Sequence, residues 1–85
     1  MNWQVFVTDP ARRQLSKIYL QDAEKVESAI DGMANDPYIG DIQKLSGKND
    51  VWRRRVGSYR IFYKPDFNQR IIYILEILRR TSKTY

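Results

Sequence analysis

Apolar and polar residues alternate most clearly between Trp52 and Tyr63, where two β-rich runs flank Gly57-Ser58. Glycine followed by a small polar residue is a signal of a type II′ hairpin turn, because glycine accepts the positive φ of the first turn position. The turn predicts a register that pairs Val56 with Tyr59, Arg55 with Arg60, Arg54 with Ile61, Arg53 with Phe62 and Trp52 with Tyr63. Side chains alternate between the faces of a sheet. The predicted faces are Trp52, Val56, Tyr59, Ile61 and Tyr63 on one side and Arg53, Arg55, Arg60 and Phe62 on the other.

The rest of the pattern predicts two helices and two further strands. In chain order the elements are a strand over 2–8, a helix capped by Asp9 with Pro10 at its first position, a second helix from Gln21 or Asp22 to an Asn35-Asp36-Pro37 stop, a polar connection over 38–50, a turn over 65–69 and a strand over 70–78. The dense apolar run in the last strand suits a central strand buried on both faces. The order β-αα-βββ predicts an α+β domain with an antiparallel sheet and a two-helix hairpin on one face.

Length and composition narrow the class of protein. A chain of 85 residues has room for a single domain, predicted over 1–85. It contains no Cys and no His, which argues against disulfides, thiolate metal sites and the commonest catalytic base. The carboxylates are scattered over the first half, so we expect neither a metal site nor another cofactor. The apolar runs are too short for a signal peptide or a membrane span, and a cytoplasmic location is expected.

Positive charge is concentrated in the second half of the chain. Residues 1–50 hold six basic and eight acidic residues, whereas residues 51–85 hold nine basic and two acidic ones. This asymmetry indicates a polyanionic partner, either a nucleic acid or an acidic protein segment.

The arginines of the predicted hairpin are the strongest candidates for chemistry. Arg55 opposite Arg60 is a like-charge pair, which destabilises a sheet unless an anion binds there. The alternatives are a solvated face with well-spread arginines and a phosphate-binding floor, and the common face favours the second. Arginine and tyrosine together suit RNA cleavage in which the ribose 2′-hydroxyl is the nucleophile. Glu76 is either a neighbour of the sheet arginines or a catalytic base, and both interpretations stay open.

Three segments resemble a known family. Arg53-x-Arg55-Val56-Gly57-x-Tyr59-Arg60, the preceding Lys44-Leu45-Ser46-Gly47, and an apolar strand ending in Arg80 with Tyr85 five residues later are similar to motifs of the RelE/ParE superfamily of type II toxins. The resemblance implies a RelE-like fold and a ribosome-dependent mRNA endonuclease. It assigns catalytic roles to Arg53, Arg55, Arg60, Arg80 and Tyr85. Arg60 and Arg80 would bind the transition-state phosphate, and Tyr85 would stack on a base or help to move the 2′-proton.

The resemblance also implies partners. We expect a cognate acidic antitoxin, the ribosome and mRNA, with DNA contacted only through the antitoxin. Further RNA-binding candidates are Lys44, Lys48, Arg79 and Lys83. Two alternatives stay open: a ParE-like toxin that inhibits DNA gyrase without nuclease activity, and a non-toxic basic module that binds nucleic acid.

Overall fold

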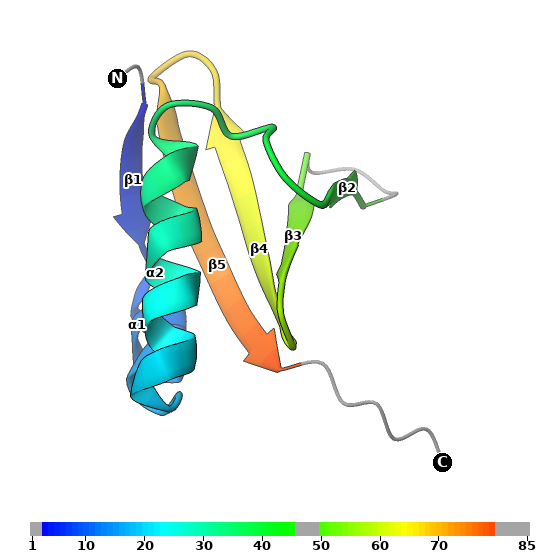
Figure 1. Cartoon of the computed structure of the whole chain (residues 1–85). Coiled ribbons are helices and arrows are strands. Elements are labelled where there is room, and N and C mark those ends of the chain that lie inside the picture. Colours follow the sequence, from blue (N-terminus) through cyan, green and yellow to red (C-terminus); the bar gives the residue numbers. More distant parts are fainter. Residues whose placement is uncertain (1–2, 46–49, 80–85) are drawn as a thin grey trace.

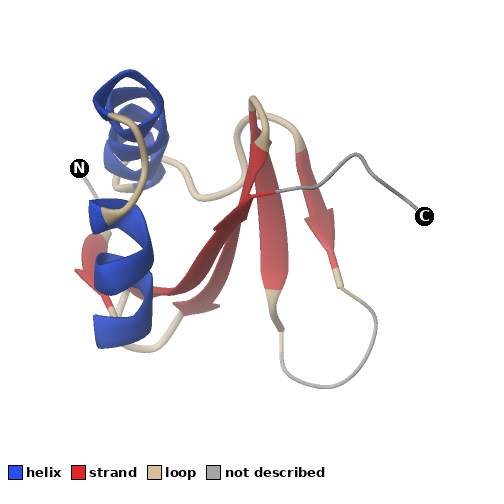
Figure 2. Ribbon diagram, turned by 90° about the horizontal axis from the view of Figure 1, so that it is seen from below, coloured by secondary structure: helices blue, strands red, loops and turns tan. Residues whose placement is uncertain are grey.

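The structure is a computed structural model that describes residues 3–45 and 50–79 (Figure 1). The elements are β1 (Gln4–Val7), α1 (Asp9–Ser16), α2 (Leu20–Met33), β2 (Ile42–Lys44), β3 (Trp52–Val56), β4 (Tyr59–Asp66) and β5 (Ile71–Arg79). In this part of the chain, five strands form one sheet in the order β1-β5-β4-β3-β2. Both helices lie on the same side of the sheet (Figure 2). The predicted α+β fold with two helices on one face is therefore confirmed.

The sheet is mixed, whereas the sequence pattern predicted an antiparallel sheet. β1 runs parallel to β5, with Gln4 opposite Ile71 and Val7 opposite Ile74. The neighbouring pairs β5–β4, β4–β3 and β3–β2 are antiparallel. β4 pairs with one edge of the apolar strand β5, and β1 pairs with the other edge. The two helices connect β1 to the rest of the sheet in such a way that β1 runs parallel to β5. The direction of β1 is thus set by the tertiary arrangement.

A fifth strand, β2, lies within the segment that was predicted to be a polar connection. It has three residues and pairs with β3, so that Ile42 lies opposite Arg54 and Gln43 opposite Arg53. Its short length and its polar residues gave no strand signal, because a recognisable strand pattern needs four or more alternating residues.

The first helix begins one residue earlier than predicted, because Thr8 and not Asp9 is its cap. The Thr8 side chain accepts a hydrogen bond from the amide of Ala11 at 3.4 Å and donates one to the carbonyl of Ile74 at 2.7 Å. Asp9 occupies the first turn, where a negative charge favours the helix dipole. The second helix also begins early, at Leu20, and Tyr19 caps it without a side-chain hydrogen bond.

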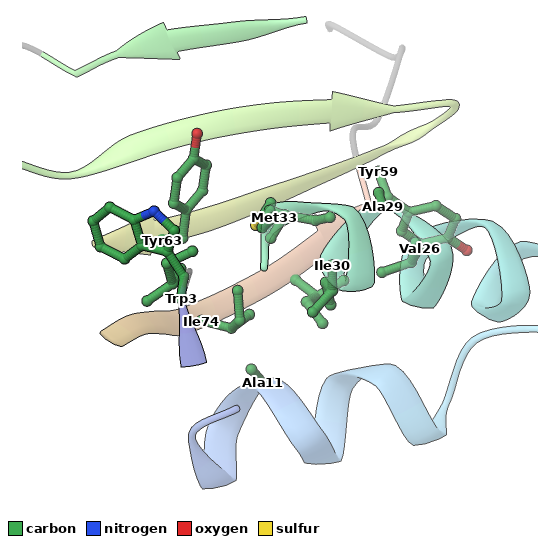
Figure 3. Close-up of a cluster of buried hydrophobic side chains, with 12 residues drawn as sticks. Trp3, Ala11, Val26, Ala29, Ile30, Met33, Tyr59, Tyr63 and Ile74 are labelled. Carbon is green, nitrogen blue, oxygen red and sulfur yellow. The ribbon is translucent and has the colours of Figure 1, made fainter. Parts of the chain in front are cut away.

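The hydrophobic core fills the space between the helices and the sheet. Figure 3 shows Val26, Ile30 and Met33 of α2 pointing toward the strands, where Tyr63 and Ile74 lie. The buried Tyr63 hydroxyl donates to the carbonyl of Pro37 at 2.5 Å, which ties the segment after α2 to the sheet. No described helix is long and apolar enough to span a bilayer.

Only one face of β5 is buried, which corrects the prediction of a strand buried on both faces. Ile72, Ile74 and Ile77 point into the core, whereas Tyr73 is half-buried and Leu78 is 40% exposed. The second face stays accessible because both described helices lie on the other side of the sheet. The apolar run of β5 is therefore partly a surface feature.

Candidate functional site

The hairpin of β3 and β4 forms in the predicted register, which places three arginines on one face. Arg55 lies opposite Arg60, and Arg53 lies opposite Phe62 one row further from the turn. Gly57 adopts a φ of +58°, the positive value that the first position of the turn requires. Since side chains alternate along a strand, Arg53 and Arg55 point to the same side, away from the helices. We call this side of the sheet the distal face.

Two rows of side chains cross the distal face from β2 to β5. The row nearer the turn is Asp41, Arg55, Arg60 and Leu78, and the next row is Gln43, Arg53, Phe62 and Glu76. Residues two apart on a strand, like facing residues on adjacent strands, are close enough to interact. Arg53, Arg55 and Arg60 therefore form one group, which we call the arginine cluster.

Arg53 is the buried member of the arginine cluster. Only 7% of the residue is exposed, and its Nη2 donates to Gln43 Oε1 at 2.6 Å. Its Nη1 is also buried and has no hydrogen-bond partner in the described part of the chain. A buried charge is costly unless a group of opposite charge compensates it, and here the partner is an uncharged amide. Among the described residues, Arg53 thus contributes positive charge to the distal face with no carboxylate paired to it.

Arg55 and Arg60 are the more accessible members. Arg55 Nε lies 3.7 Å from Asp41 Oδ2, with 40% and 58% of the two side chains exposed. A pair this exposed is screened by water and weak. Arg60 is half-buried, and its Nε has no hydrogen-bond partner among the described residues. Two exposed carboxylates, Asp41 and Glu76, therefore border three guanidinium groups on the distal face, and only Asp41 pairs with one of them among the described residues. The remaining excess of positive charge suits a phosphate oxyanion.

The other sequence candidates in the described residues lie outside the arginine cluster. Lys44 faces Trp52 on the opposite side of the sheet and pairs with Asp50 at 3.1 Å. Arg79 faces Tyr59, which places it on the helix side at the end of β5. Glu76 lies on the distal face, opposite Phe62, and is exposed. It is thus a diagonal neighbour of Arg60.

Four candidates, Lys48, Arg80, Lys83 and Tyr85, lie outside the described residues. The structure therefore brings together Arg53, Arg55 and Arg60, and these three define the candidate site. Within residues 3–45 and 50–79, no three His, Cys, Asp or Glu side chains are grouped so that they could hold a metal ion.

Two tyrosines in the described residues have raised pKa values. Burial raises the pKa of Tyr63 to about 12, and this effect outweighs the opposing charge of Arg54. Burial, together with Asp50 and Asp36, also raises the pKa of Tyr38. Both phenols stay protonated at neutral pH, so neither is suited to remove a proton there.

Sequence reasoning missed the β2 side of the site. Asp41 and Gln43 contact two of the arginines, yet both lie in the segment that was interpreted as a loop. Arg54 was predicted opposite Ile61, which is confirmed, but was assigned to neither face. It points to the helix side and packs on Gly40, where an added Cβ would lie 2.5 Å from its Nε. No local pattern could have indicated this strand, because three residues are too few for a recognisable alternation.

The two-helix layer on one face of a mixed sheet matches the fold of RelE toxins. Residues 5–83 match the family model described as "ParE toxin of type II toxin-antitoxin system, parDE". The chain therefore belongs to the ParE toxin family of the RelE/ParE superfamily.

Individual relatives agree with this assignment. The chain is 28% identical over 83 residues to the protein named RelE1 of Methanocaldococcus jannaschii, covering 94% of this chain and 92% of that relative. Its fold is similar to RelE in the RelE–RelB complex of Pyrococcus horikoshii, with a TM-score of 0.85, 23% identity and coverage of 98% of this chain and 100% of the other. For the RelBE2 toxin–antitoxin complex of Mycobacterium tuberculosis the TM-score is 0.82, with 24% identity and coverage of 94% and 100%.

Proposed function

We propose that this type II toxin is a ribosome-dependent mRNA endonuclease. The observation that carries the proposal is the arginine cluster, in which Arg53, Arg55 and Arg60 share one face and have Asp41 as their one paired carboxylate among the described residues. Guanidinium stays charged at any physiological pH and binds phosphate oxygens through two parallel hydrogen bonds. A cluster of this kind is suited to the trigonal-bipyramidal phosphate of RNA cleavage.

The reaction uses a nucleophile that the RNA itself supplies. The ribose 2′-oxygen attacks the adjacent phosphorus, the bond between phosphorus and the 5′-oxygen breaks, and a 2′,3′-cyclic phosphate forms. The 2′-hydroxyl loses a proton and the departing 5′-oxygen gains one. Negative charge grows on the non-bridging oxygens, and cations placed there in advance lower the barrier. In this scheme guanidinium groups provide that stabilisation, and no metal ion is needed.

Individual residues take different parts in this scheme. Arg55 and Arg60 bind the phosphate oxygens, because they are the accessible members of the arginine cluster. Arg53, which is buried, raises the local positive potential from below. We retain Arg80 as a second phosphate ligand and Tyr85 as the residue that stacks on a base or helps to move the 2′-proton, as the family resemblance implies.

Substitution of Arg60 tests the proposal. We expect the purified toxin to cleave mRNA on ribosomes and to leave a 2′,3′-cyclic phosphate. Arg60→Ala should lower the single-turnover rate by about a hundredfold or more, the scale of losing one oxyanion donor. Arg13→Ala is the matched control, because Arg13 is an exposed arginine on α1, in the helix layer. Equal rates for Arg60→Ala and the parent would contradict the proposal.

A cognate acidic antitoxin is part of this proposal. The P. horikoshii and M. tuberculosis relatives were both solved as complexes with an antitoxin. We infer that an acidic antitoxin segment covers the arginine cluster and keeps it from RNA, because opposite charges attract and the cluster carries an excess of positive charge. We retain Lys44, Lys48, Arg79 and Lys83 as further RNA-binding candidates, of which Lys44 and Arg79 lie on the helix side of the sheet. DNA is reached only through the antitoxin. The ribosomal target places the toxin in the cytoplasm.

The match to the ParE family model favours a second candidate, inhibition of DNA gyrase without RNA cleavage. Profiling transcripts after induction separates the two candidates. A nuclease leaves cut mRNA and no DNA damage, whereas a gyrase inhibitor leaves intact mRNA, a DNA damage response and a stable complex with gyrase.

A further inference from the structure

The two groups that contact the arginine cluster come from one short segment at the edge of the sheet. Gln43 lies in β2 directly opposite Arg53, and Asp41 precedes β2 beside Arg55. Residues two apart on a strand point to the same side. Both side chains therefore reach the distal face from the same edge, next to the arginines that they contact.

Each of the two residues binds one part of a guanidinium group and leaves the rest free. Gln43 Oε1 accepts from Arg53 Nη2 at 2.6 Å, and Asp41 Oδ2 lies 3.7 Å from Arg55 Nε. The main chain adds a further link, because the amide of Arg55 donates to the carbonyl of Asp41 at 2.9 Å.

We propose that Asp41 and Gln43 are positioning residues that orient Arg55 and Arg53 for a phosphate group before RNA binds. The inference rests on the proposed function of the arginine cluster. An arginine side chain has several rotatable bonds, and ordering it in advance removes part of the entropic cost of binding. A phosphate group is bound in a defined geometry only if neighbouring residues hold the arginine side chains in place.

The chemical types of the two partners fit their places. Gln43 is uncharged, so it satisfies the buried Arg53 without cancelling its charge. Asp41 is charged but solvent-exposed, so its pair with Arg55 is weak and can be exchanged for a phosphate. The exposed pair also reduces the repulsion between Arg55 and Arg60 while no anion is bound.

The segment before β2 is anchored, so Asp41 has a defined place. Gly40 adopts a φ of +91° and lies against the Arg54 guanidinium, where a Cβ would be 2.5 Å from Nε. Further back, Pro37 accepts the hydrogen bond of the buried Tyr63 hydroxyl. Both ends of the approach to Asp41 are thus fixed by contacts with β3 and β4.

Two nearly isosteric substitutions test the inference on the full chain. Gln43→Glu keeps the shape of the side chain but gives Arg53 a carboxylate, which lowers the local positive potential. We expect kcat on programmed ribosomes to fall about tenfold, the scale of one charge-assisted hydrogen bond, while KM changes much less. Asp41→Asn should lower kcat by a smaller factor, and Asp41→Glu should restore it. Gln21→Glu and Asp31→Asn make the same charge changes on exposed positions of α2 and should leave kcat unchanged.

Side-chain NMR of the arginine Nε–Hε groups separates this inference from the proposed function. In the free parent protein the Arg53 and Arg55 groups should be ordered; Gln43→Ala should release Arg53 alone, and Asp41→Asn should release Arg55 alone. Unchanged order in both variants, or unchanged kcat in both Gln43→Ala and Asp41→Asn, would overturn the positioning role. If the parent protein does not cleave mRNA, the proposed function fails, and the NMR experiment still decides whether Asp41 and Gln43 orient the arginines.

Discussion

At the scale of single residues, the buried charge of Arg53 is unfavourable for folding, and its proposed role lies in function. It carries a buried charge whose described partner is an amide. Replacing a buried charge by an apolar side chain of similar volume is often neutral or stabilising. A residue that lowers stability but raises the positive electrostatic potential at the surface is typical of a functional site, where local stability is often sacrificed.

This leads to a prediction for Arg53→Met. The free energy of unfolding should stay equal to that of the parent or rise by about 1 kcal/mol, because the aliphatic part of the side chain is retained and the charge is removed. Cleavage of mRNA should nevertheless fall. Urea titration and a ribosome cleavage assay measure the two quantities, with Arg13→Met as the control for a simple loss of charge. A large drop in stability would show that Arg53 has a structural role.

Tyr63 gives a prediction about alkaline pH. Its pKa is raised to about 12 in the folded protein, chiefly by burial, from the ordinary value of 10.0 for tyrosine. The folded state therefore holds the phenol proton more tightly than the unfolded chain, so this contribution to stability is complete below pH 10.0 and is lost as pH rises toward 12. The urea midpoint of the parent should fall over this window more steeply than that of Tyr63→Phe.

Tyr63→Phe should also be about 1 kcal/mol less stable than the parent at neutral pH, because the Pro37 carbonyl loses its hydrogen-bond donor. Parallel pH curves for the two proteins would contradict the assignment.

At the scale of elements, the hairpin was predictable and β2 was not. The Gly57-Ser58 turn sets the register of β3 and β4 by local geometry alone, so the common face of Arg53, Arg55 and Arg60 followed from the sequence. β2 forms because β3 offers a free edge, and nothing in three residues encodes that edge. The same reasoning explains why Asp41 and Gln43 were missed: their role depends on a pairing between segments, and only the arginines carried a local motif.

Two glycine substitutions should have opposite effects on stability, and the one at Gly40 tests the anchoring of β2. Gly40→Ala places a Cβ 2.5 Å from Arg54 Nε at a residue with a φ of +91°, so it should destabilise the protein by about 1–3 kcal/mol. Gly32 lies in α2, and an added Cβ would meet no atom within 4 Å beyond its chain neighbours and the backbone of its own helix. Gly32→Ala should therefore stabilise the protein by about 0.5–1 kcal/mol. Thermal unfolding of the two variants measures both effects. Equal shifts in the same direction would show that the contact with Arg54 is unimportant.

At the scale of the whole molecule, the two faces of the sheet differ in what they carry. The helix side holds the core, whereas the distal face combines the arginine cluster with exposed apolar residues such as Phe6 and Leu78. The parallel placement of β1 could not be read from the sequence, because it depends on how the helical hairpin returns the chain. The asymmetry of charge between the two halves of the sequence was readable, and in the fold it becomes an asymmetry between the two layers.

That asymmetry predicts how salt affects RNA binding. Phosphate contacts release counterions, so the logarithm of the association constant falls linearly with the logarithm of salt concentration, with a slope of about −0.7 per neutralised phosphate for single strands. Removing one phosphate ligand should therefore make the slope shallower by about 0.7. We expect this change for Arg55→Gln with a single-stranded RNA oligonucleotide, measured by fluorescence anisotropy over a range of KCl concentrations. Arg13→Gln removes an equal charge from the helix layer and should leave the slope as it is, because an exposed charge on the other side of the sheet is screened over such a distance. Identical slopes for the two variants would mean that net charge, and not the placement of the arginines on the distal face, governs RNA binding.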